Sequence, residues 1–226
     1  MQPNDIVVAV FEFVLLIFSL SVHECAHAWM ASRLGDQTAR LQGRITLNPI
    51  PHIDPIGTLL FPALMIVGSM FGYGGFLIGW AKPTPVITRN FKKIVRDDNL
   101  VTLAGPASNL LLALGGFLGL VIIILTTRSV PVHHTLDSSV DALSALCDLG
   151  IQVNLALFVF NLLPIPPLDG SHILRNFLPY KMAAAFDQIG ILSYLLMFFV
   201  GSAVINVVMP PAMHLVYAAL TRIQGA

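Results

Sequence analysis

Long apolar runs dominate the pattern of hydrophobic and polar positions along the chain. A hydrocarbon layer of about 30 Å requires about 20 consecutive, mostly apolar residues in a helix. Four runs reach that length, and they cover residues 6–30, 100–125, 142–163 and 189–209. Pro210 and Pro211 follow the fourth run and predict that its helix ends there, so residues 212–223 are expected to form a short interfacial helix.

A fifth apolar region, residues 56–79, is interrupted by glycines and is either one crossing or a re-entrant hairpin that enters and leaves on the same face. Lys and Arg collect in cytoplasmic loops. In this chain they are concentrated in residues 33–44, 82–96 and 175–181. A re-entrant hairpin places all three basic loops inside and the N-terminus outside, whereas a single crossing forces one basic loop outside. The charge pattern therefore favours the hairpin.

The composition fits a polytopic membrane protein that forms a single domain over residues 1–226. Hydrophobic residues make up 56% of the chain and charged residues only 11%, whereas a soluble domain is about 25% charged. Lys+Arg and Asp+Glu number 12 each, so no net charge favours nucleic acid as a partner. We expect an all-α membrane fold of about four transmembrane helices plus the fifth segment, with small strands or loops at the inner face near residues 44–47 and 86–88.

The first apolar run contains His23-Glu24-Cys25-Ala26-His27, which is an H-E-x-x-H motif. Histidines four apart on a helix share one face, so both imidazoles can bind one metal ion, and Glu24 can take a proton from the water that the metal activates. Ionisable groups at bilayer depth are costly, which makes them candidates for a functional site. A buried polar cluster that only holds helices together is the alternative.

A zinc hydrolase site needs a third protein ligand. Glu12 and Glu24 are the only glutamates in the chain, so a downstream glutamate is excluded. Asp169 is the best candidate, because it follows prolines that break the third run at its inner end and precedes Gly170, which permits a tight turn. The first and third runs both lead from outside to inside, which places Asp169 at the depth of the histidines. His172 ranks below it.

Three asparagines and one inner-face segment are further candidates. The amide of Asn109 could hydrogen-bond an oxyanion or a substrate carbonyl, or it could connect helices. Asn154 and Asn161 share a helix face and could clamp an unwound substrate backbone, although a polar packing stripe explains them equally well. His52 and Asp54 could lie behind the metal ligands or contact a lid, although a structural turn is the simpler explanation.

Together these motifs resemble the site-2 protease family of intramembrane zinc metalloproteases. The resemblance rests on H-E-x-x-H in a transmembrane helix, on Gly105-Pro106-Ala107-Ser108-Asn109, and on Asn161-Leu162-Leu163-Pro164 leading to Pro167-Leu168-Asp169-Gly170. It spans residues 13–178 and is closest to the compact prokaryotic branch without PDZ or CBS domains. It implies that His23, His27 and Asp169 bind one Zn²⁺ per chain and that Glu24 is the general base.

The expected protein is therefore a multi-pass protein of the prokaryotic cell (inner) membrane with its N-terminus outside. It would hydrolyse peptide bonds of transmembrane helical protein substrates near the cytosolic face, by means of metal-activated water. The lipid bilayer and a membrane-protein substrate are its expected partners, and the oligomeric state is left open. The alternatives are a catalytically silent zincin-like scaffold and, less favoured because the chain shows no internal repeat, a metal transporter.

Overall fold

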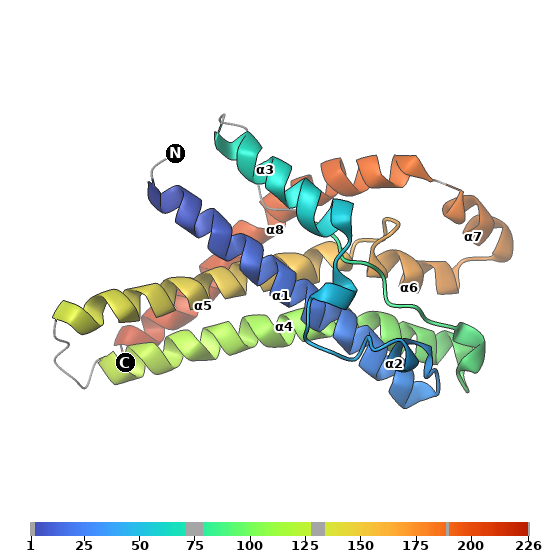
Figure 1. Ribbon diagram of the computed structural model, residues 1–226, viewed down its shortest axis with the longest axis horizontal. Helices are drawn as coiled ribbons and strands as arrows, with labels where there is room; N and C mark the ends of the chain where they lie inside the picture. The colour runs from blue at the N-terminus through green and yellow to red at the C-terminus, as the bar shows by residue number, and fades with distance from the viewer. Residues whose placement is uncertain (1–2, 71–78, 128–133, 189, 226) are drawn as a thin grey trace.

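Four long apolar helices form the body of the protein. The computed structural model describes residues 3–70, 79–127, 134–188 and 190–225. The long helices are α1 (Pro3–Leu34), α4 (Ile94–Thr127), α5 (His134–Asn161) and α8 (Ile191–Gly225) (Figure 1). Each contains a stretch that is long and apolar enough to cross a membrane, and these stretches are Val7–Leu34, Ile94–Thr127, Ser139–Asn161 and Leu192–Gly225. The predicted membrane fold class is confirmed.

Short helices and loops connect the four long helices. They are α2 (Thr38–Leu41), the 3₁₀-helix η1 (Ile50–His52), the π-helix η2 (Pro55–Leu60), α3 (Phe61–Met70), the 3₁₀-helix η3 (Thr88–Asn90), α6 (Asp169–Phe177) and α7 (Tyr180–Asp187). The part of the chain that the structure describes contains no β-strand, so loops occupy the two places where strands or loops were expected. Ile87 shows the reason, because its N–H donates to the Asp36 carboxylate rather than to a neighbouring strand.

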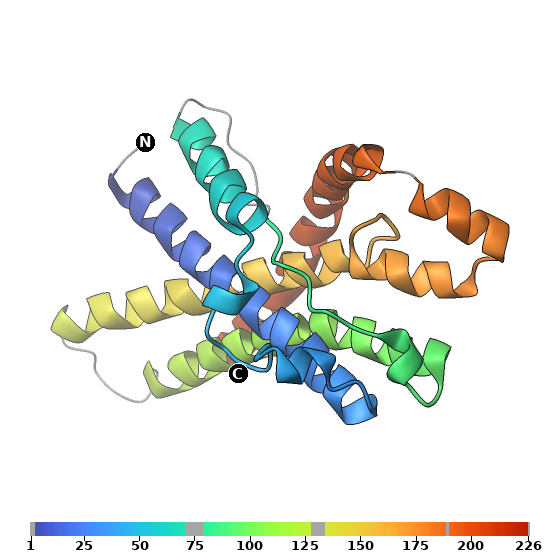
Figure 2. The ribbon, with the colours of Figure 1, turned by 45° about the vertical axis from the view of Figure 1, so that its right-hand side comes forward.

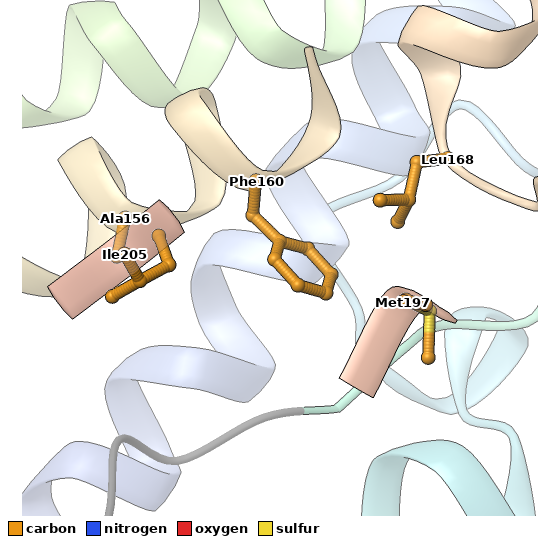
Figure 3. Close-up of a cluster of buried hydrophobic side chains, with 5 residues drawn as sticks. All are labelled: Ala156, Phe160, Leu168, Met197 and Ile205. Carbon is orange, nitrogen blue, oxygen red and sulfur yellow. The ribbon is translucent and has the colours of Figure 1, made fainter. Parts of the chain in front are cut away.

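In the centre of the bundle, α4 packs along both α1 and α5, and α1 crosses them obliquely (Figure 2). One apolar cluster joins α4, α5 and α8 through Leu120, Ile151, Met213 and Leu220. A second cluster joins α5 to α8 and consists of Ala156, Phe160, Leu168, Met197 and Ile205 (Figure 3). Leu168 directly precedes α6, so the second cluster holds the beginning of that helix against the bundle.

The last helix differs from the sequence prediction. It continues through Pro210 and Pro211, so the expected helix end at 209 and the separate interfacial helix at 212–223 are wrong. Two prolines remove two backbone hydrogen bonds, but packing holds the helix on both sides of them. Met209 contacts the cluster around Phe160, and Met213 belongs to the cluster around Ile151. Proline is tolerated inside membrane helices when neighbouring helices support the backbone in this way.

The segment that was expected to be a re-entrant hairpin returns to its starting point. The N–H of Trp80 donates to the carbonyl of Gly57 (3.2 Å), and the Thr58 hydroxyl donates to the carbonyl of Trp80 (2.7 Å). The glycines at 72, 74 and 75 lie outside the described residues. Because the ends of the segment lie side by side, it does not end on the opposite side of the bundle, which agrees with the hairpin rather than the single crossing.

An extended segment, residues 79–87, leads from the hairpin to α4 and is called the strap below (Figure 1). Asp36 attaches the end of the strap to the end of α1. Its carboxylate is fully buried and accepts hydrogen bonds from the N–H of Ile87 (2.7 Å), the N–H and hydroxyl of Thr38 (3.1 and 2.6 Å) and the amide of Asn90 (2.8 Å). Burial by itself would raise the pKa of Asp36, but these hydrogen bonds outweigh it and lower the pKa below its usual value.

We expect Asp36→Asn to lower the free energy of unfolding by about 1–3 kcal/mol, because an amide cannot accept all four hydrogen bonds. The contribution of Asp36 to stability is present above its unfolded-state pKa of about 3.9 and is lost as the pH falls through the lower folded-state value. The thermal unfolding midpoint in detergent, measured from pH 7 downward, should therefore fall less steeply with acid in Asp36→Asn than in the wild type. Asp141→Asn, at an exposed aspartate, is the matched control. Equal acid dependence in both variants would contradict the assignment.

Candidate metal centre

Three side chains from two distant segments converge on one point. His23 and His27 lie one turn apart on α1, and their Nε2 atoms are 3.0 Å apart. Asp169, the first residue of α6, places Oδ2 3.1 Å from Nε2 of His23 and 3.4 Å from Nε2 of His27. Both histidines are buried. The structure thus brings together the three residues that the sequence proposed as metal ligands.

The partners of the other ring nitrogens determine which atoms carry protons. Nδ1 of His27 lies 2.7 Å from the carbonyl of Val101, which can only accept, so Nδ1 is the donor. Nδ1 of His23 lies 2.6 Å from Oδ1 of Asn109, whose amide nitrogen faces Oδ1 of Asn154 at 3.0 Å. In neutral imidazoles this leaves a lone pair on each Nε2, and both lone pairs point toward Asp169.

Three electron-pair donors that face one another require a cation. Oδ2 of Asp169 is buried and receives no hydrogen bond. Ligands about 2.0–2.1 Å from a tetrahedral zinc ion lie about 3.3–3.4 Å from one another, and the three separations here are 3.0, 3.1 and 3.4 Å. These residues therefore fit a zinc ion.

Two glycines make room for the ligands. A Cβ at Gly105 of α4 would overlap the rings of His27 and His23, so the imidazoles rest directly on the α4 backbone. A Cβ at Gly170 would overlap the carbonyls of Leu162 and Leu163, so α6 can begin close to the end of α5 only without a side chain there. Both glycines belong to the motifs that carried the family resemblance.

Glu24 lies beside the ligands but has a different partner. One of its carboxylate oxygens lies within 4.8 Å of the ligand nitrogens of His23 and His27. Its Oε2 accepts a hydrogen bond from the main-chain N–H of Thr84 in the strap (2.7 Å). Because Oδ2 of Asp169 has no such donor, the hydrogen bonding favours Asp169 over Glu24 as the third candidate ligand. Sequence reasoning did not identify Thr84, although its position between two prolines marks it as the only main-chain donor in residues 83–85.

A cavity of about 800 Å³ opens over these residues. The strap, the beginning of α4, the end of α5 and α6 line it, and Glu24, Asp169, Asn161 and His172 contribute to its wall. Water or a peptide can therefore reach the metal position from this side.

The remaining candidates lie in different surroundings. Asn109 and Asn154 are buried, and their amides form a chain from the carbonyl of Gly150 to the ring of His23. This placement favours the helix-connecting alternative over substrate binding for both. Asn161 lines the cavity and donates to the carbonyl of Leu157, so its expected contact with substrate stays a prediction.

The inner-face pair has structural contacts. Asp54 accepts hydrogen bonds from the N–H groups of Ile56 and Gly57 at the beginning of η2. His52 is buried, and its Nε2 lies 3.0 Å from the carbonyl of Thr46. These contacts agree with the structural turn that was the simpler explanation for both residues.

The chain is similar to known metalloproteases. The sequence profile described as "Peptidase family M50" matches residues 125–201, which contain α5, the turn to Asp169, α6 and α7. A protein of Bacillus subtilis (strain 168) named "Putative zinc metalloprotease YwhC" is 41% identical over 175 residues, which cover 77% of this chain and 72% of that protein. The chain belongs to peptidase family M50, the site-2 proteases.

Two mycobacterial proteins are also similar to this chain. The protein named "Putative zinc metalloprotease Rip2" of Mycolicibacterium smegmatis is 34% identical over 164 residues, and the one of Mycobacterium tuberculosis is 33% identical over 156 residues. The chain spans about half the length of these two, at 55% and 52%. No solved structure matches the chain. This M50 protein is thus a zinc metalloprotease of the membrane.

We expect Gly105→Ala to weaken zinc binding about 10–100-fold, as is typical when groups that orient metal ligands are altered. The added methyl group would push the two imidazoles off the α4 backbone. Gly115→Ala, on the same helix, is the matched control because a Cβ there meets no atom within 4 Å. Competition of each purified variant with a chromogenic zinc chelator measures the affinity, and equal affinities for the two variants would contradict the packing argument.

Asp169→Asn should remove most of the bound zinc, because an uncharged amide replaces the one anionic ligand while the size of the side chain is kept. Zinc per chain, measured by atomic absorption after gel filtration, should fall well below that of the wild type and of Asp141→Asn. Full zinc content in Asp169→Asn would show that another group completes the site.

Proposed function

We propose that this protein is an intramembrane zinc endopeptidase that cleaves transmembrane helices of other membrane proteins near the cytosolic face. The observation that carries the proposal is the position of the metal site on a membrane-spanning stretch. His23 and His27 lie within Val7–Leu34, and the third ligand comes from α6, directly after another such stretch has ended. His27 lies seven residues before the end of α1, which is about 10 Å along the helix. One zinc ion per chain is the stoichiometry that a single set of three ligands supports.

The chemistry follows from the donor set. A zinc ion held by His23, His27 and Asp169 would polarise the scissile carbonyl and lower the pKa of a bound water to about 7. Glu24 accepts a proton from the attacking water and returns it to the leaving amine. The Val101 carbonyl and the Asn109 amide hold the two imidazoles in the required tautomer.

The substrate must present an accessible carbonyl to this site. A helix engages its carbonyls in its own hydrogen bonds, so the substrate must unwind locally within the cavity between the strap and α6. Residues with low helix propensity near the scissile bond should therefore favour cleavage.

The orientation of the protein follows from its basic loops. Arg33 lies in the last turn of α1, Arg40 lies in α2 just after it, and Lys92 and Lys93 directly precede α4. The positive-inside rule places these ends in the cytosol and the N-terminus outside. In a prokaryote this corresponds to the inner membrane, with water reaching the metal by a short path from the cytosol.

Glu24→Gln should keep its zinc but lower kcat about 100–10,000-fold, which is the typical contribution of a positioned general base. The rate is measured in proteoliposomes with a single-span reporter helix that carries glycine residues near its cytosolic end. Glu12→Gln, at the other glutamate of α1, is the matched control and should cleave at the wild-type rate. A Glu24→Gln variant with full zinc and full activity would overturn the proposal, and zinc uptake into the vesicles without any cleavage by the wild type would favour a transporter.

A further inference from the structure

We infer that Thr84 is a positioning residue for the reaction, because its main-chain N–H fixes the carboxylate of Glu24 beside the metal and ready to accept a proton. This inference rests on the proposed role of Glu24. It adds a residue of the strap, 60 positions away in the sequence, to the machinery around the H-E-x-x-H motif.

Two hydrogen bonds join Thr84 to Glu24. The N–H of Thr84 donates to Oε2 of Glu24 at 2.7 Å, and the Thr84 hydroxyl donates to the main-chain carbonyl of Glu24 at 3.0 Å. The first bond has the short length of a charge-assisted hydrogen bond to a carboxylate. The second holds the strap in register on α1, so that the donor stays opposite the side chain it serves.

The strap is anchored on both sides of Thr84. The N–H of Trp80 donates to the carbonyl of Gly57, and the N–H of Lys82 donates to the carbonyl of His52 (2.8 Å). On the other side, the N–H of Ile87 donates to Asp36. Trp80, Lys82 and Thr84 alternate along the extended strap, so their N–H groups all point to the same edge, toward the protein. The Thr84 donor is therefore set by the fold and does not move with the Glu24 side chain.

This fixed donor has two consequences for catalysis. A glutamate side chain has three rotatable bonds, and a bond to one oxygen selects the conformers in which Oε1 is the oxygen available to accept a proton. The same bond also keeps Glu24 from turning toward the two imidazoles as a metal ligand, although its carboxylate lies within 4.8 Å of their nitrogens. Thr84 thus helps to separate the base from the ligands.

The test removes the main-chain N–H of residue 84. Thr84→Pro removes the donor and suits an extended strap that already has proline on both sides. We expect kcat for the single-span reporter in proteoliposomes to fall about 10–100-fold, since misplacing a catalytic group by about 1 Å costs this much. KM and zinc content should stay within about twofold of the wild type, because the ligands do not contact Thr84.

Further variants distinguish the effect of losing the N–H donor from the effects of losing the Thr84 side chain and of introducing a proline. Thr84→Val keeps the N–H and loses only the hydroxyl, so kcat should fall much less than in Thr84→Pro, and Thr84→Ser should restore it. The effect of proline itself is measured in the Glu24→Gln background, where any loss of kcat that does not act through Glu24 remains.

A double-mutant cycle decides whether Thr84 acts through Glu24. If it does, Thr84→Pro should change kcat less than about twofold in a Glu24→Gln background, because the effects of residues that act as a unit are not additive. An equal loss in both backgrounds would overturn the inference while leaving the role of Glu24 intact. A fully active Glu24→Gln variant would instead overturn the proposed function.

A second variant covers the case in which Thr84→Pro does not fold. The Arg44 guanidinium donates to the carbonyls of Pro51 and Lys82, and so holds the strap two residues before Thr84. Arg44→Gln loosens this anchor and should lower kcat with zinc retained, again much less in the Glu24→Gln background. Unchanged kcat in Arg44→Gln, or an equal loss in both backgrounds, would count against the inference.

Discussion

The structure depends on three candidate metal ligands that converge on one point. Two imidazole nitrogens and one carboxylate oxygen lie 3.0–3.4 Å apart in a buried position. With both imidazoles neutral, their lone pairs and the carboxylate repel one another unless a cation lies among them. A zinc ion bound by these three residues would remove the repulsion and would join α1 to the beginning of α6.

The rest of the bundle is built so that these donors can meet. Gly105 lets the two imidazoles rest on the α4 backbone, and Gly170 lets α6 begin against the end of α5. Leu168 anchors the turn before Asp169 in the apolar cluster of α5 and α8 (Figure 3). The amide chain from α5 through Asn109 then fixes the ring of His23. Together these contacts involve α1, α4, α5, α6 and α8, so the geometry of the site depends on the correct assembly of these helices.

How far the sequence could predict this arrangement varies from element to element. The spanning helices follow from the length of the apolar runs, and the pairing of His23 with His27 follows from the helical period. Asp169 could be selected because prolines and a glycine mark a sharp turn at the right depth. The continuity of α8 through Pro210 and Pro211 could not be predicted from the sequence, because packing on α4 and α5 outweighs the local preference of proline. The buried contacts of Asn109 and Asn154 also depend on which helices are neighbours.

By itself, then, the sequence indicated a membrane protein, a metal-binding chemistry and the identity of the proposed ligands, because each of these follows from local residue spacing and from composition. The tertiary structure decided which hydrogen-bond donor pairs with which acceptor. It directed the amide of Asn109 to the ring of His23, left Oδ2 of Asp169 without a donor, and brought the N–H of Thr84 to Glu24. The physical reason is that a hydrogen-bond partner is chosen by which segments meet in space, and no local pattern carries that information.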